Sequence, residues 1–468
     1  METLLDPGEP YFRVDLGTHL PMPIYFSLVG LHMVAHYKLL AMPNLSRAFM
    51  QWATSLIVVS LVLLPLWRGV NPEHPLVDMG VSFGCVFSAI RVALLTAAAC
   101  RQSASEQRAA IKRALHKKLD DYPSASAQMA AAPAKTGLAI SSLGDYIRAM
   151  YLDEPAPAAH LSSQQIERSN GRSVASAVDS VQAQLIHLAN GYDQWLKSIG
   201  WHTLPFWIRY PLSPLAYLLM LQLPLALVVR NVDFLTLYSV DRTAAAYFYG
   251  MSAAGAFLRW TLVIVALVFA FYLGMLMWYA IVFDLVQWAV GAPARRDLFR
   301  RPWLTSSPRD LWGRRWNLPV QTSLAEAVYQ PCCRLLDAAA QRAYALAAGG
   351  RQAGLPRPLR RANRFVAGFG VFCLSALIHE YTLSVAFGRS DLDHLRFFCF
   401  HGLLTIGYTL LETAACAILP SALMPNASLP FVVGWLLTWI CMALSAQWFF
   451  MPYIRGGLVD NFVYYAFL

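Results

Sequence analysis

Long runs of apolar residues recur along the chain, and they constrain its fold more than any other feature. The runs lie at about residues 24–42, 53–70, 76–99, 211–230, 243–291, 364–388, 396–419 and 429–451. A helix of about 20 apolar residues crosses the hydrocarbon core of a bilayer. Lipid offers no hydrogen-bond partner to a peptide group, so a spanning segment of this kind is a helix. The sequence therefore predicts an all-α polytopic integral membrane protein.

The number of spans depends on the longest run, residues 243–291. It is long enough for two crossings, or for one crossing and a second, tilted helix. The stretch "MSAAGAFLRW", residues 251–260, carries Arg259 and predicts a break there, because a charge inside a spanning helix is costly. We therefore expect about eight to ten transmembrane helices.

The distribution of charge predicts an orientation. Charged residues make up 14% of the chain, against about 25% in soluble domains, yet the net charge is +10. Most of the excess falls in two stretches, residues 101–120 and 295–364, the second of which holds fourteen arginines. Basic loops mark the cytosolic side, and an odd number of crossings within 243–291 puts both stretches there and the N-terminus in the lumen. The charge flanks membrane spans and accompanies no groove-reading motif, so nucleic acid is not an expected partner.

The same pattern divides the chain into five parts. We expect N-terminal transmembrane helices in 1–100, a cytosolic insertion in 101–205, further transmembrane helices in 206–292, a cytosolic or re-entrant loop in 293–363, and C-terminal transmembrane helices in 364–468. Residues 1–23 are polar and contain prolines, so they do not resemble a cleavable signal peptide. The first apolar run is then the expected targeting signal.

One of the C-terminal spans contains a histidine and a glutamate, His379 and Glu380, in the sequence "SALIHEY". Ionisable groups inside a span usually face a polar cavity and mark function, although a hydrogen bond between helices is the simpler explanation. Burial disfavours the charged imidazole, and a neutral imidazole in a dry cavity can accept a proton from an alcohol. Glu380 is the next residue around the helix, so it should face elsewhere, and an arginine is a possible partner.

A second polar feature precedes this span by about sixty residues. The sequence "PRDLWGRRWN", residues 308–317, holds three arginines, two tryptophans, and Asn317 at its end. Arginine and tryptophan are typical of a segment anchored at the membrane interface. That explanation does not cover Asn317, whose amide can donate a hydrogen bond to an oxyanion. Guanidinium groups suit the phosphates of a nucleotide-bearing acyl donor.

Together the two features resemble the paired motifs of the membrane-bound O-acyltransferase family. The first motif matches in order from Trp312 to Asn317, and it is most similar to the wax-synthase-like branch, whose motif is close to "FWGRRWN". Leu311 stands where that branch usually has phenylalanine. "SALIHEY" follows at the expected separation. The resemblance covers about residues 295–450.

The resemblance implies an enzyme of the endoplasmic reticulum that moves an acyl group from acyl-CoA to a hydroxyl group inside an internal reaction chamber. His379 matches the catalytic histidine of the family, and Asn317 matches its second polar residue. Fungal members of the branch acylate terpenoid or polyketide alcohols, often with acetyl groups, and plant members make wax esters. Acyl-CoA is a co-substrate, and neither a metal nor a bound cofactor is implied.

The expected roles follow from the chemistry. His379 takes the proton of a lipophilic alcohol as its oxygen attacks the thioester, and Asn317 stabilises the oxyanion or positions His379. We group Arg314, Arg315, Trp312 and Trp316 as the substrate- and CoA-binding set. For the two arginines, binding of CoA phosphates and simple structuring of the loop remain equal alternatives.

Some features of the sequence are compatible with other functions. A transporter could use His379 and Glu380 as a proton relay, but no inverted repeat is evident. A catalytically inactive scaffold does not require His379 and Asn317, and both are present in the sequence. "GVSFG" at Gly80–Gly84 fits the nucleophile-elbow pattern, which requires a strand, turn and helix rather than a membrane span. His32 and His36 have a spacing that suits a metal, but no second ligand pair accompanies them.

Overall fold

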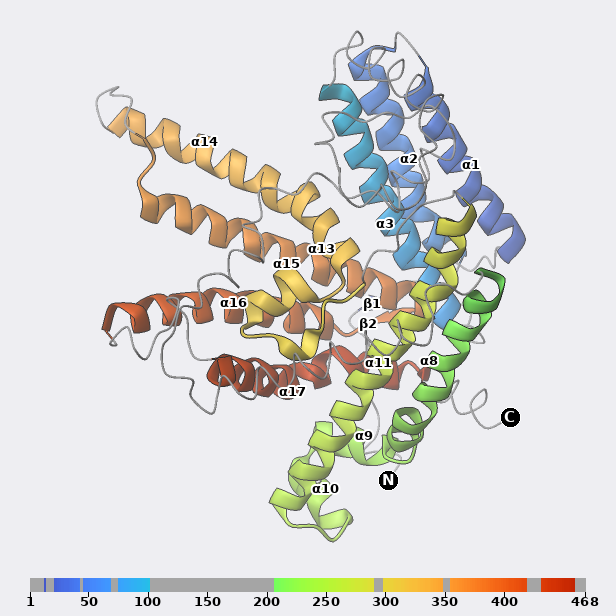
Figure 1. Cartoon of the computed structure of the whole chain (residues 1–468), viewed down its shortest axis with the longest axis vertical. Coiled ribbons are helices and arrows are strands. Elements are labelled where there is room, and N and C mark those ends of the chain that lie inside the picture. Colours follow the sequence, from blue (N-terminus) through green and yellow to red (C-terminus); the bar gives the residue numbers. More distant parts are fainter. Residues whose placement is uncertain are drawn as a thin grey trace.

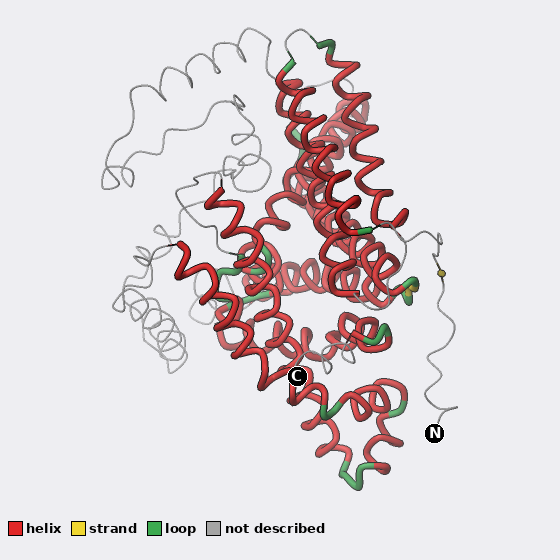
Figure 2. The backbone as a smooth tube through the Cα atoms, turned by 90° about the vertical axis from the view of Figure 1, so that its right-hand side faces the viewer, coloured by secondary structure: helices red, strands yellow, loops and turns green. Residues whose placement is uncertain are grey.

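A computed structural model describes residues 12–13, 21–42, 45–68, 75–101, 206–289, 298–347, 354–418 and 431–458. Nearly all of these residues are helical, and the two strands have two residues each. Figure 2 shows the described residues almost entirely as helices, with short loops between some of them. The predicted all-α class is confirmed. The predicted insertion, apart from Arg101, lies outside the described residues.

The first three helices form an antiparallel bundle, drawn in blue in Figure 1. They are α1 (Met22–Ala41), α2 (Arg47–Arg68) and α3 (Pro75–Arg101). Leu61 and Val92 lie in the apolar core of the bundle and are fully buried. Hydroxyl groups join the helices in this core, since Thr96 of α3 bonds both His36 and Thr54 at 2.9 Å. Such bonds between helices satisfy polar groups that lipid cannot.

A second group consists of two long helices joined through two short ones. It contains α8 (Phe206–Val229), α9 (Val232–Val240), α10 (Arg242–Phe248) and α11 (Ala253–Ala289), with α8 packed along α11. The polypeptide turns between α10 and α11 at Gly250, whose φ of 62° favours glycine. Figure 1 shows α9 and α10 together at one end of the molecule.

The long run does break near the predicted stretch Met251–Trp260, but the break lies between α10 and α11 at residues 249–252, and Arg259 itself is inside the continuous helix α11. Arg259 is tolerated there because its charge is satisfied. Its Nε donates to Asn231 Oδ1 at 2.8 Å, and its guanidinium lies over the rings of Phe234 and Tyr249, at 4.4 and 4.7 Å. A single crossing in this region is an odd number, as the predicted orientation requires.

The third group contains the polar motif, and its long helices form a stack in Figure 1. Short elements come first: η3 (Pro302–Leu304), α12 (Pro308–Asp310), η4 (Leu311–Arg315), α13 (Leu318–Leu324) and η5 (Ala325–Tyr329). The long helices α14 (Gln330–Ala347), α15 (Arg357–Phe387), α16 (Asp393–Ile418) and α17 (Phe431–Arg455) follow. Because α15 packs against α3 as well as α16, it joins this stack to the N-terminal bundle.

Seven of the described helices are long and apolar enough to cross a membrane: α1, α2, α3, α8, α11, α15 and α17. The predicted run at 396–419 is also a helix, α16, but it is not among the seven. Two buried histidines and Glu412 make it more polar than the others. The described helices therefore supply seven spans, or eight with α16, because the long run 243–291 forms one spanning helix instead of two.

A two-residue sheet ties the N-terminal region to the C-terminal stack. Strand β1 (Phe12–Arg13) pairs antiparallel with β2 (Arg389–Ser390), with Phe12 opposite Ser390. β2 follows the end of α15, whereas the polar motif precedes its start. The sheet therefore lies beyond the end of α15 that follows His379.

The contact between α17 and the motif segment depends on Gly434. A Cβ atom there would overlap the carbonyl oxygen of Ser306 and lie 2.6 Å from the Tyr408 hydroxyl. We therefore expect Gly434→Ala to lower the free energy of unfolding by about 1–3 kcal/mol, the usual cost of overpacking. Thermal unfolding of the purified protein in detergent measures this. Gly274→Ala in α11, where nothing lies within 4 Å, is the matched control and should stabilise slightly. Equal shifts of both variants in the same direction would contradict the close contact.

Candidate active site

Aromatic rings from three other helices surround the His379 imidazole. The ring centroids of Phe398 and His394 on α16 lie 4.5 and 5.5 Å away, that of Phe449 on α17 at 5.8 Å and that of Phe83 on α3 at 6.1 Å. These neighbours present almost no charge to the imidazole. Such surroundings favour a neutral histidine and strengthen any hydrogen bond that it makes.

The hydrogen bond of His379 defines which nitrogen can act. Nδ1 lies 2.8 Å from the backbone carbonyl of Ser375, one turn earlier in α15. A carbonyl only accepts, so Nδ1 carries the proton, and the neutral ring has its lone pair on Nε2. The described residues give Nε2 no hydrogen-bond partner, and His379 retains accessible surface. The geometry therefore provides a proton acceptor, which is what a general base requires.

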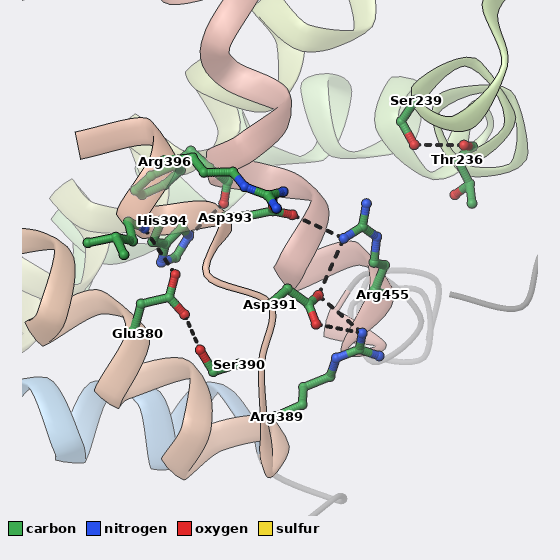
Figure 3. Close-up of polar contacts among 12 residues, drawn as sticks. Thr236, Ser239, Glu380, Arg389, Ser390, Asp391, Asp393, His394, Arg396 and Arg455 are labelled. Carbon is green, nitrogen blue, oxygen red and sulfur yellow. Dashed lines mark hydrogen bonds and ion pairs between the residues drawn. The ribbon is translucent and has the colours of Figure 1, made fainter. Parts of the chain in front are cut away.

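Glu380 points away from this imidazole, as its position around the helix predicts. Figure 3 shows its carboxylate directed at the loop between α15 and α16. One oxygen accepts the backbone N–H of Leu395 at 3.0 Å, and the other accepts the Ser390 hydroxyl. Among the described residues, no arginine pairs with Glu380, although the sequence made one a possible partner. A backbone N–H at the start of α16 takes its place, because the first turn of a helix leaves such groups unpaired.

Replacement of Glu380 should affect stability first. Glu380→Ala leaves the Leu395 N–H and the Ser390 hydroxyl without their buried acceptor, which should lower the free energy of unfolding by about 2–3 kcal/mol. Glu380→Gln keeps an acceptor for Leu395 and should cost about 1 kcal/mol. Thermal unfolding in detergent compares the two. An alanine variant as stable as wild type would contradict the role of Glu380 at this helix start.

Ion pairs hold the same loop against the end of α17. Asp391 accepts from Arg389 at 2.8 Å and from Arg455 at 3.3 Å. Asp393 accepts from Arg455 at 3.0 Å and from Arg396 at 2.7 Å. Figure 3 shows the network beside Glu380. It fixes the start of α16, the helix that supplies His394 and Phe398 to the surroundings of His379.

The polar motif folds into a compact turn built around Asp310. Its Oδ2 accepts the backbone N–H of Ser306 at 3.1 Å and Nε of Arg315 at 2.5 Å. After Asp310, residues Leu311–Arg315 form a π-helical turn. The hydrogen bond from Trp316 N to Leu311 O, 3.0 Å long, closes this turn. Turns of this kind are rare and often occur at functional sites.

The two motif arginines occupy different environments. Besides Asp310, Arg315 donates from Nη1 to the carbonyls of Arg300 and Arg301 at 3.3 and 3.4 Å. It therefore structures the loop, one of the two alternatives that the sequence left open. Arg314 is exposed, and the described residues give it no ion pair. Of the two, Arg314 is the one available to a phosphate.

The two motifs meet at the ring of Phe398. Trp312 lies 6.1 Å from that ring, and His379 lies 4.5 Å from it. Trp316 lies 6.3 Å from Trp312 and packs on Phe299 at 4.7 Å. The structure therefore brings the tryptophan motif and the histidine motif together through one aromatic side chain.

Asn317 ends the motif turn in a left-handed conformation, with φ 41° and ψ 62°. It begins α13, and its carbonyl accepts the N–H of Gln321 at 2.9 Å. Asparagine is among the few residues that tolerate this conformation. The described residues show no hydrogen bond between the side chains of Asn317 and His379, so a joint role of the two remains a prediction.

Two further histidines of α16 had no predicted role, and both are fully buried. His394 packs against the His379 ring and donates from Nε2 to the carbonyl of Phe449 at 2.8 Å. His401 contacts Trp312, with ring centroids 5.4 Å apart. The sequence does contain a signal for them, because His394, Phe398 and His401 recur at helical spacing and share one face.

The rival sequence features do not form a second site among the described residues. His32 bonds Ser60 at 2.6 Å and His36 bonds Thr96, so hydroxyl groups of neighbouring helices occupy them. No described group of three histidine, cysteine or acidic side chains could hold a metal ion. Burial raises the pKa of the Cys333 thiol above its ordinary value, which makes it a poor nucleophile.

Apolar helices surrounding a neutral histidine, beside a tryptophan-rich turn, define an integral membrane protein with a buried basic nitrogen. Residues 295–400 match the model of the Membrane bound O-acyl transferase family. This part of the chain is therefore similar to that family, as the two motifs predict. The matched residues contain both motifs and the start of α16.

Several relatives show the same similarity over a limited part of the chain. A probable long-chain-alcohol O-fatty-acyltransferase 3 of Arabidopsis thaliana is 27% identical over 39% of this chain and 47% of its own length. An acyl-CoA–sterol O-acyltransferase 1 of the same plant is 26% identical over 39% and 48%. A long-chain-alcohol O-fatty-acyltransferase of Simmondsia chinensis is 26% identical over 35% and 39%. The chain thus spans about half or less of each relative that it matches.

Proposed function

We propose that the protein is an acyl-CoA-dependent O-acyltransferase that esterifies the hydroxyl group of a lipophilic alcohol. The observation that carries this proposal is the free Nε2 of His379, fixed as an acceptor by the Ser375 carbonyl and surrounded by aromatic rings. The match to the family model supports it, because the matched residues contain the two features that meet at Phe398.

In the proposed reaction, Nε2 of His379 takes the hydroxyl proton as the alcohol oxygen attacks the thioester carbonyl. The new C–O bond forms first, and the carbonyl electrons move to an oxyanion. Collapse of this tetrahedral intermediate breaks the C–S bond, and the departing CoA sulfur receives the proton from His379. Base and acid are thus the same nitrogen. No covalent acyl-enzyme is required, since a thioester is already activated.

Polar groups of the motif have the remaining roles in this proposal. The Asn317 amide donates to the oxyanion or orients His379. Arg314 binds CoA phosphates at the cytosolic mouth, whereas Arg315 maintains the turn. Trp312 and Trp316 form the aromatic wall between the donor and the buried base. CoA enters from the cytosol, the alcohol enters from the bilayer to an internal reaction chamber, and no metal or bound cofactor takes part.

The names of the relatives favour long-chain acyl donors and long-chain or sterol alcohols. Resemblance to the fungal branch favours acetyl transfer to a terpenoid or polyketide alcohol. The two proposals differ in the donor, since a long chain needs a deep apolar tunnel and an acetyl group does not. The endoplasmic reticulum is the compartment that we propose for either reaction.

The test supplies membranes containing the protein with labelled acetyl-CoA or palmitoyl-CoA and with fatty, sterol, terpenoid and polyketide alcohols. Labelled ester is expected from one donor class. Binding of CoA to the purified protein is measured in parallel. A protein that forms no ester and binds no CoA would contradict the proposal and favour a transporter, although Glu380 does not face His379 as a two-residue relay would require.

A further inference from the structure

His401 is a buried polar residue for which the proposed reaction has no use. It lies on α16, its side chain has no exposed surface, and aromatic rings including Phe397 pack on it at 4.4 Å. A buried polar group normally has hydrogen-bond partners, and His401 has two. Its Nδ1 lies 3.4 Å from Nε1 of Trp312, and its Nε2 lies 2.8 Å from the hydroxyl of Ser445 on α17.

The chemistry of these partners fixes the direction of every hydrogen bond. An indole N–H can only donate, so Nδ1 of His401 accepts, and the single proton of the neutral ring is on Nε2. Nε2 therefore donates to Ser445, whose own hydroxyl donates to the carbonyl of Cys441 at 2.8 Å. This series of hydrogen bonds runs from Trp312 through His401 and Ser445 to the backbone of α17. In each bond, the donor and the acceptor are fixed.

This series of hydrogen bonds attaches the tryptophan motif to α16 and α17, the helices that supply Phe398 and Phe449 to the surroundings of His379. Trp312 belongs to the turn η4 that leads to Asn317. His401 is one helical turn beyond Phe398, whose ring contacts both Trp312 and His379. If the Trp312 indole loses its hydrogen-bond acceptor, it can shift away from Phe398, the ring that lies between the two motifs. A displacement of about 1 Å is enough to slow a reaction about 100-fold.

We propose that His401 is a positioning residue for acyl transfer. It holds the Trp312 indole, and with it the turn that carries Asn317, in register with the His379 imidazole. This role rests on the proposed function. The alternative is that His401 only fills space between helices, in which case its hydrogen-bonding atoms would not matter to the rate.

Three substitutions separate the two possibilities. His401→Leu removes both hydrogen bonds. His401→Asn offers an oxygen near the position of Nδ1, where it can accept from Trp312. His401→Gln reaches instead toward Ser445, because its amide is one carbon farther out. We expect His401→Leu and His401→Gln to lower kcat about 30- to 100-fold, with KM changed less than about threefold. His401→Asn should keep kcat within about tenfold of wild type.

His36 is the matched control, since it is equally buried and also bonds a hydroxyl on a neighbouring helix. His36→Leu should lower the thermal midpoint as His401→Leu does, but leave kcat within about twofold. A kcat that falls equally in the asparagine and glutamine variants, or that follows thermal stability in all variants, would overturn the positioning role.

A thermal cycle of Trp312→Phe, His401→Leu and the double variant needs no substrate. Coupled residues give a double variant whose shift is smaller than the sum of the single shifts. Additive shifts would show that His401 does not hold Trp312 and would overturn the proposal whether or not ester forms. Coupled shifts in a protein that forms no ester would contradict the proposed function and leave the link between the two residues supported.

Discussion

Protein that carries His379→Ala is expected to form ester about 1,000-fold more slowly than wild type, a loss typical of a removed general base. Nε2 of His379 is the basic nitrogen at the meeting point of the two motifs, and water has poor access to replace it among the surrounding aromatic rings. The measurement is initial-rate ester formation by purified protein, with the donor and alcohol identified in the substrate test.

His379→Gln separates the loss of the base from the loss of packing. Glutamine fills much of the same volume but cannot take a proton at neutral pH, so it should be as inactive as alanine. Both variants should bind acyl-CoA within about threefold of wild type, because the base does not hold the donor. If either variant retained a tenth of wild-type activity, His379 would not be the base.

Loss of the Asn317 side chain is expected to have the second largest effect. Asn317→Gly should lower kcat about 100-fold, because the reaction loses a donor to the oxyanion. Glycine adopts φ 41° without strain, so the stability of the protein should hardly change. Asn317→Ala should add a backbone cost of about 1 kcal/mol at this left-handed position. Steady-state kinetics and thermal unfolding together resolve the two effects.

Leu392 provides the control for glycine at a left-handed position, since its φ is 57° and it lies in the loop before α16. Leu392→Gly should leave kcat within about twofold of wild type. An Asn317→Gly variant with unchanged kcat would remove the amide from the chemistry and limit Asn317 to a structural role at the start of α13.

Much of the fold could be predicted because each spanning helix corresponds to one continuous apolar stretch of the sequence. The predicted run at 76–99 lies within α3, and the run at 364–388 ends one residue beyond α15. The break falls at residues 249–252 and not at Arg259 itself, because a charge in an apolar run ends a helix only when no partner neutralises it. Arg259 has Asn231 and Phe234, which lie outside its own apolar run and which hydropathy does not connect to it.

The site could be predicted only in part for the same reason. His379 was evident from its local sequence, and the motif arginines were evident as a set. Which arginine structures the turn depends on Asp310 and on two carbonyls across the loop. The partners of His401 lie on two other elements. No spacing along one segment gives the register between helices that creates these contacts.

The shared ring at Phe398 has a consequence for how such proteins diverge. A residue that serves both the tryptophan turn and the histidine can change only if both accept the replacement, so we expect lineages to retain an aromatic side chain there. Phe83 and Phe449 also face His379, but they lie outside the segment that matches the family, residues 295–400. New alcohol preferences should therefore arise by drift in α3 and α17, while the inherited segment keeps the chemistry.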